Sequence, residues 1–156
     1  MPRPVTVHAD EMDAPAVSAT TAAALRAEMR RFATECGTRR ALPTVLHVGV
    51  LADHRITIPA DPSYDAGLRA DLLTRALDRL AEPAGLTAWL TRGGFTTACD
   101  HDLTWLAAAD AAFGRHGVAR VSFFAVTRHG WLDVRTSQAQ TWRRVRSITR
   151  GRPGRT

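Results

Sequence analysis

The chain has 156 residues, with 21 basic side chains against 15 acidic ones, and every basic one is an arginine because the sequence contains no lysine. An apolar content of 45% over this length is enough for one domain with a real core. No apolar run approaches the roughly 20 residues of a membrane span, and the first residues lack the apolar stretch of a signal peptide. We therefore expect a cytoplasmic protein without a membrane partner, and the excess of Ala, Arg, Gly and Pro is typical of a high-GC bacterium.

The two cysteines, Cys36 and Cys99, are far apart in the sequence and form no CxxC pair. This spacing indicates neither a disulfide framework nor a zinc knuckle. We expect no cofactor and no metal from the cysteine content.

The positive charge is concentrated at one end of the chain. Residues 134–156 contain seven arginines and no acid, whereas the remainder carries 14 arginines and 15 acids. A neutral body with a basic arm is typical of proteins that bind polyanions. The alternative is a solvated tail that keeps the protein in solution.

Apolar spacing predicts three helices and five strands in the body of the chain. Apolar positions at helical spacing, with Ser, Thr or Asp as caps and Gly or Pro as stops, predict the helices at 18–36, 63–80 and 102–115. Short β-branched or apolar runs predict the strands at 44–51, 55–58, 86–91, 120–127 and 131–134.

The alternation of these elements predicts an α/β (or α+β) fold, in which a single mixed sheet of about five strands is covered by three or four helices. We expect a flexible leader at 1–17, one globular domain at 18–135 and an arginine-rich arm at 136–156. The helical spacing of Ala139, Trp142 and Val145 leaves a fourth helix open within the arm.

The densest polar cluster is formed by Cys99, Asp100, His101 and Asp102 at the start of the third predicted helix. The junction of a strand and a helix is where α/β folds place their sites. The Asp–His–Asp triplet offers metal ligands, together with His47 or His54, and Cys99 with His101 as base offers a nucleophile. The alternative is that the aspartates cap the helix and Cys99 is a small buried hydrophobe.

The element order around this cluster resembles that of JAB/MPN-type metalloproteases. In that family two histidines in H-x-H spacing follow the strand, and an aspartate comes after them. Those positions are Thr91, Gly93 and Asp102 in this chain, and its first strand contains no glutamate. The resemblance implies a non-catalytic relative that has lost the zinc site.

The arm interleaves arginines with an aromatic and two aliphatic residues. Arginine binds phosphate through two hydrogen bonds, and Trp142 is able to stack on a base. The tetrapeptide Arg150-Gly151-Arg152-Pro153 resembles the AT-hook core, which implies an extended segment lying in the minor groove of A·T-rich DNA. The residues expected to contact nucleic acid are Trp142, Arg143, Arg144, Arg146, Arg150, Gly151, Arg152, Pro153 and Arg155.

These patterns favour a small, non-enzymatic protein that contacts nucleic acid through its arginine-rich arm. One alternative is a hydrolase or transferase that uses Asp100, His101 and Asp102. The other is a protein-interaction subunit or an inactive relative of an enzyme. In that case the arm docks on an acidic partner, or packs on its own body through Trp142, Val145 and Ile148.

Overall fold

The computed structural model describes residues 16–142. In this part the helices are α1 (Ala19–Cys36), α2 (Ala66–Asp78) and α3 (Asp100–Arg115), with a short 3-10 helix at Pro83–Gly85. The strands are β1 (Val45–Gly49), β2 (Arg55–Pro59), β3 (Thr87–Thr91), β4 (Phe123–Thr127), β5 (Gly130–Asp133) and β6 (Ala139–Thr141). None of the helices in the described range is long and apolar enough to span a bilayer.

All six strands form one mixed sheet in the order β2-β1-β3-β4-β5-β6. Only β3 and β4 run parallel, and every other neighbouring pair is antiparallel. The predicted α/β fold with a single mixed sheet is therefore confirmed. The sixth strand, β6, lies in the segment that the sequence assigned to the arm, so the fold extends to Thr141 and the spacing of Ala139 and Trp142 does not form a helix there.

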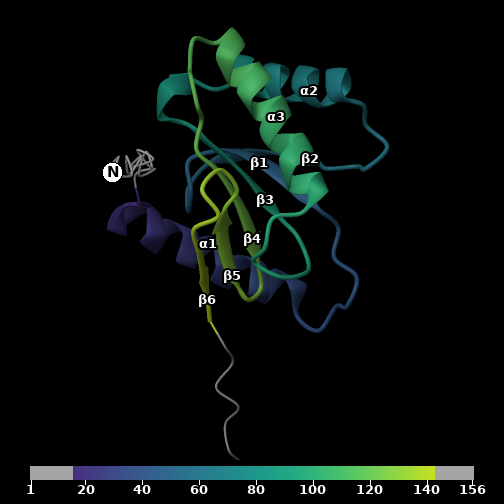
Figure 1. Ribbon diagram of the computed structural model, residues 1–156, viewed down its shortest axis with the longest axis vertical. Coiled ribbons are helices and arrows are strands. Elements are labelled where there is room, and N and C mark those ends of the chain that lie inside the picture. Colours follow the sequence, from purple (N-terminus) through teal and green to yellow (C-terminus); the bar gives the residue numbers. More distant parts are fainter. Residues whose placement is uncertain (1–15, 143–156) are drawn as a thin grey trace, which may run out of the picture.

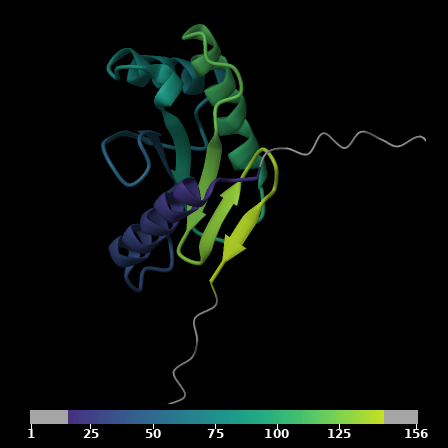
Figure 2. The ribbon, with the colours of Figure 1, turned by 90° about the vertical axis from the view of Figure 1, so that its left-hand side faces the viewer.

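The helices lie on opposite faces of the sheet (Figures 1 and 2). Because side chains alternate along a strand, the strands β3, β4 and β5 contribute to two cores. Leu46, Leu90 and Phe123 pack under α2 and α3, whereas Trp89 and Phe124 pack under α1. The protein is thus a three-layer sandwich, with two helices on one face and one helix on the other.

The helix ends follow the predicted caps. The Ser18 hydroxyl accepts the Thr21 N–H at the start of α1, and the Asp65 carboxylate accepts the Leu68 N–H at the start of α2. The predicted apolar stripe of α1 is buried, and the helix ends at Cys36 before Gly37, whose φ of 53° suits a residue without a Cβ.

The polarity of the sheet face below α1 changes from one edge of the sheet to the other. Towards β4 and β5 it is apolar, and α1 packs there against Phe124, Val126 and Trp131. Towards β1 and β2 the same face carries His47 and Thr57 instead. This polar half of the face positions the candidate site.

Candidate functional site

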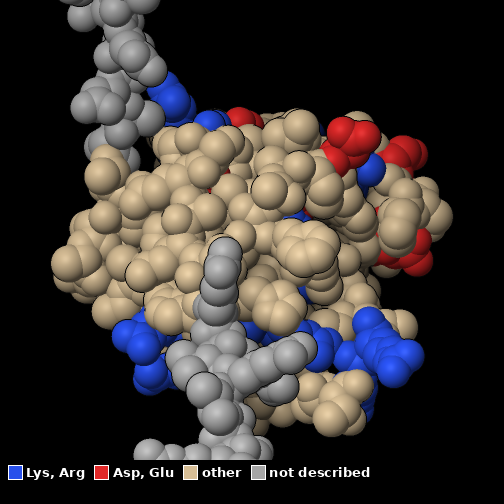
Figure 3. All heavy atoms as spheres, turned by 60° about the horizontal axis from the view of Figure 1, so that its bottom comes forward, with Lys and Arg blue, Asp and Glu red and all other residues tan. Residues whose placement is uncertain are grey.

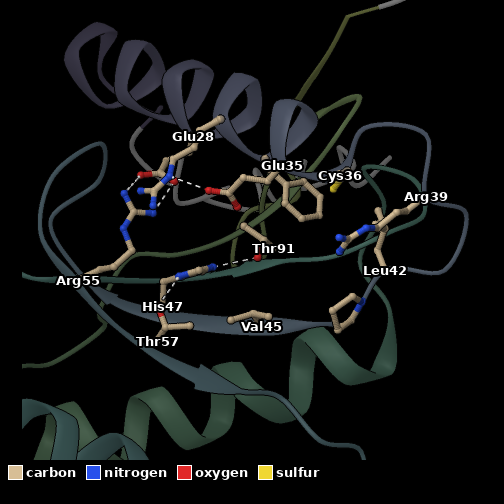
Figure 4. Close-up of a pocket in the computed structure, with 13 residues that line it drawn as sticks. Glu28, Glu35, Cys36, Arg39, Leu42, Val45, His47, Arg55, Thr57 and Thr91 are labelled. Carbon is tan, nitrogen blue, oxygen red and sulfur yellow. Dashed lines mark hydrogen bonds and ion pairs between the residues drawn. The ribbon is translucent and has the colours of Figure 1, made fainter.

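A pocket of about 280 Å³ lies between α1 and the inner face of β1, β2 and β3 (Figure 4). Its floor is formed by alternate strand residues, Val45 and His47 from β1 and Thr57 from β2. Phe32 and Cys36 from α1 and the loop residues Leu42 and Pro43 form its apolar walls. The remaining lining residues carry charge or a hydroxyl: Glu28, Arg31, Glu35, Arg39, Arg55 and Thr91.

His47 lies between two threonine hydroxyls on the pocket floor. Its Nε2 is 2.9 Å from Oγ1 of Thr91, and its Nδ1 is 3.3 Å from Oγ1 of Thr57. The ring also stacks on Trp89, with centroids 5.4 Å apart and planes inclined by 20°. Burial, with a further contribution from the Arg55 charge, lowers the pKa of His47 from 6.5 to about 4. The imidazole is therefore neutral at physiological pH.

A neutral His47 leaves one hydroxyl hydrogen unused on the floor. The imidazole and the two threonines carry three polar hydrogens, and the two hydrogen bonds among them use only two. Which threonine keeps the spare hydrogen depends on the histidine tautomer. In either case the floor offers one neutral O–H donor to a ligand atom.

The side of the pocket nearest the β1–β2 turn is formed by a buried ion pair. Both guanidinium arms of Arg55 donate to the Glu28 carboxylate, at 2.6 and 2.5 Å, and the Ala52 N–H donates to the same carboxylate at 2.7 Å. Burial by itself raises the pKa of Glu28, but the hydrogen bonds from Arg55 and Ala52 outweigh it and leave the pKa below its ordinary value. The Arg55 guanidinium also lies 4.9 Å from the centroid of the Trp89 ring. The pair is a rigid wall without net charge.

The outer rim carries a surplus of positive charge. Arg31 and Glu35 form an exposed ion pair at 3.0 Å. Arg39 makes no ion pair within the described residues, and Figure 4 shows its guanidinium directed towards the pocket. Burial raises the pKa of the Cys36 thiol, which disfavours a thiolate nucleophile in this wall. The arrangement is suited to binding rather than to nucleophilic chemistry.

The structure places Asp102, a predicted catalytic candidate, in a buried structural contact. Its side chain is fully buried, and each carboxylate oxygen accepts a hydrogen bond of 2.8 Å from Arg92. It also accepts the Cys99 N–H at 3.1 Å, as a helix cap does. The remaining N–H groups of Arg92 donate hydrogen bonds to the carbonyls of Gly93, Phe95 and Thr97. The Arg92–Asp102 pair therefore fixes the loop before α3.

The other members of that cluster do not converge with Asp102. Asp100 and Cys99 are exposed, and Nε2 of His101 accepts the indole N–H of Trp105 at 2.8 Å. His47 belongs to the pocket beneath α1, whereas Asp100 and His101 line a separate shallow hollow. Among the residues described, no group of three or more His, Cys, Asp or Glu side chains is arranged to hold a metal ion. This geometry gives the hydrolase or transferase alternative no support.

Trp142 is the last residue that the structure describes, and it is anchored to the domain. Its N–H donates to the His129 carbonyl at 2.7 Å, and its ring packs beside the cluster of Leu25 and Trp131. The Arg26 guanidinium lies 5.3 Å from the ring centroid. Trp142 therefore fixes the point from which the arm begins. The other residues predicted to bind nucleic acid, 143–146 and 150–155, lie outside the described range.

Exposed charge is divided between the two helical layers. Arg26, Arg30, Arg39 and Arg40 are exposed on α1 and the loop after it, and none forms an ion pair within the described range. In Figure 3 most of the blue surface follows the lower part of the view, and the red surface lies at the upper right. The exposed acids of α2, α3 and their loops are Asp61, Asp65, Asp71, Asp78, Glu82, Asp100 and Asp110.

Sequence reasoning considered His47 only as a metal ligand and missed its threonine partners and the Glu28–Arg55 pair. A signal was present, because His47 and Thr57 interrupt apolar strands at alternate positions. No family model matches the chain, and neither the curated proteins nor the solved structures contain a significant match to it.

Proposed function

We propose that the protein binds nucleic acid through its arginine-rich arm together with the exposed arginines of α1 and the following loop. The observation that carries the proposal is the division of charge. The part of the arm that follows the sheet begins at Trp142, directly beside Arg26, on the layer where four exposed arginines make no ion pair within the described residues. A strand of phosphates is attracted to this surplus of exposed arginines and repelled by the exposed acids of the α2 and α3 layer.

Of the seven arginines in residues 134–156, Arg135 belongs to the body. Arg135 pairs with Asp110, and its Nε donates to the Val121 carbonyl at 2.9 Å. Six arginines of the arm then follow Trp142 in the sequence. If most of them engage phosphates, the slope of log affinity against log salt is about −4 to −5.

An exposed aromatic side chain adds a stacking surface beside the arm. Phe95 is 79% exposed, and Arg92 holds its carbonyl at 3.0 Å within the fixed loop. The hydroxyl of the neighbouring Thr96 lies 2.7 Å from that of Thr141 in β6, which places the loop next to the start of the arm. Because Trp142 is already packed, Phe95 is the better candidate for stacking on an unpaired base.

The test measures binding of a duplex and of a single-stranded oligonucleotide by fluorescence anisotropy over a range of salt concentrations. Replacing all six arm arginines by glutamine in the full chain should remove most of the slope and weaken binding about a hundredfold or more. If the altered chain binds as tightly as the original, or if the original shows no binding below millimolar concentration, the proposal is wrong.

A pair of double variants tests the contribution of the body at equal charge. Arg30→Gln with Arg40→Gln removes two charges from the proposed surface, and Arg75→Gln with Arg79→Gln removes two from α2 and the residue that ends it. Only the first should weaken binding measurably, by about tenfold at low salt. Equal losses would assign binding to net charge alone. Tight binding of an acidic protein in place of oligonucleotides would favour the interaction-subunit alternative.

A further inference from the structure

We propose that the pocket beneath α1 binds a small organic anion, with an apolar body and one carboxylate or phosphate group. The pocket shares Arg39 with the proposed nucleic-acid surface, but the small-anion proposal does not depend on nucleic-acid binding.

The first argument is that the polar floor serves no evident purpose in packing. The rest of this sheet face is covered by α1 through Trp89, Phe124, Val126 and Trp131, and it forms an ordinary apolar core. At β1 and β2 the same face instead carries the buried Glu28–Arg55 pair and a half-buried histidine held between two hydroxyls. Buried polar groups are costly compared with apolar ones of the same volume, so their presence beside a cavity points to a binding role.

The second argument concerns charge. Three arginines and two glutamates line the pocket, and the histidine is neutral. Glu28 forms an ion pair with Arg55, and Glu35 forms one with Arg31. Among the described residues, Arg39 is therefore the lining cation without an acidic partner. The pocket therefore carries a surplus of one positive charge at its rim, which selects an anionic group over a cation.

The third argument concerns the remaining surface. Phe32, Leu42, Pro43 and Val45 present carbon atoms to the cavity, which suits an aromatic or branched body. The spare threonine hydroxyl beside His47 supplies one donor on the pocket floor. A ligand that places its charge at Arg39 and its apolar body against Phe32 can use each of these features at once.

The experiment uses the full chain with the six arm arginines replaced by glutamine and Cys99 replaced by serine, so that Cys36 is the only thiol. Benzoate and phenyl phosphate are the anionic probes, benzamide is the neutral one, and binding is measured by isothermal titration calorimetry. Alkylation of Cys36 by N-ethylmaleimide reports whether a probe occupies the pocket, because Cys36 lines its wall. Arg39→Ala is compared with Arg40→Ala, the adjacent exposed arginine that does not line the pocket.

At least one anionic probe should bind and slow alkylation of Cys36, and benzamide should do neither at the same concentration. Arg39→Ala should weaken that binding about tenfold, and Arg40→Ala less than about twofold. A preference for benzoate over phenyl phosphate, or the reverse, identifies the anionic group. The proposal is overturned if neither anion binds below about 10 mM, if benzamide binds equally, if both arginine variants lose the same affinity, or if Cys36 is not protected. These outcomes are read separately from the oligonucleotide test, because the chain used here already lacks the six arm arginines and its ligands are small molecules.

Discussion

The buried contact between Arg92 and Asp102 predicts a large loss of stability when Asp102 is replaced by alanine. The substitution removes both 2.8 Å hydrogen bonds and the cap on the Cys99 N–H, and it leaves a guanidinium that is only 8% exposed without its counter-ion. Removing one partner of a buried ion pair costs about 3–5 kcal/mol, and losing a helix cap by itself costs only about 1 kcal/mol, so the ion pair dominates. We therefore expect a fall of about 3–5 kcal/mol in the free energy of unfolding.

Urea unfolding followed by tryptophan fluorescence measures this difference. Asp100→Ala is the matched control, because Asp100 lies in the same first turn of α3 but is exposed, and its loss should cost less than about 1 kcal/mol. Asp102→Asn keeps an acceptor oxygen and should fall between the two. If Asp102→Ala is no more destabilising than Asp100→Ala, the carboxylate does not hold the loop, and a functional role for Asp102 returns to consideration.

Three further predictions concern the pocket, the thiols and the sheet edge. The pKa of His47 is lowered from 6.5 to about 4, so between these pH values the unfolded chain takes up a proton that the folded protein does not. The free energy of unfolding is therefore highest above pH 6.5 and decreases as the pH falls towards 4. This decrease amounts to roughly 2–3 kcal/mol. The urea midpoints measured at pH 7.5 and at pH 4.5 should differ less in the His47→Gln variant than in the original protein. An unchanged difference would contradict the lowered pKa. N-ethylmaleimide should modify exposed Cys99 at least about tenfold faster than Cys36, whose thiol is buried and has a raised pKa; equal rates measured by mass spectrometry would contradict this burial. Gly130→Ala should unpair β6, because an added Cβ would clash with the Gln140 carbonyl; amide exchange in β6 should then accelerate while that in β1 is unchanged, and protection retained in β6 would refute the clash.

The charge division and the pocket distinguish the two faces of the sandwich. The acidic layer of α2 and α3 covers a conventional apolar core. The single helix α1 covers only part of the other face, and both proposed sites lie along it. This arrangement follows from its length and direction, because α1 packs on β4 and β5 and leaves the inner face of β1 and β2 partly open.

The fold class was predictable from the sequence because it depends on local periodicity. Leu25, Met29 and Phe32 recur on one side of a helix, and the caps Ser18 and Asp65 mark where helices begin. Short β-branched and apolar runs mark the strands between the helices. Because some of these strands are joined by hairpins and others by helical crossovers, they are expected to form a mixed sheet. The strand β6 was missed because three exposed residues, Ala139–Thr141, carry no alternation of apolar and polar side chains and pair only through their backbone with β5.

The candidate site, like the fold, was only partly predictable from the sequence. The sequence by itself determined that the chain is a neutral body followed by an arginine-rich arm, because composition and order alone fix where charge lies along the chain. Only the tertiary structure decided which polar residues act together. Asp102 pairs with Arg92 across a loop, and His47 meets Thr57 and Thr91 across three strands. Such contacts depend on strand register and on the side of the sheet that each helix covers, and neither is encoded in the spacing of any short motif.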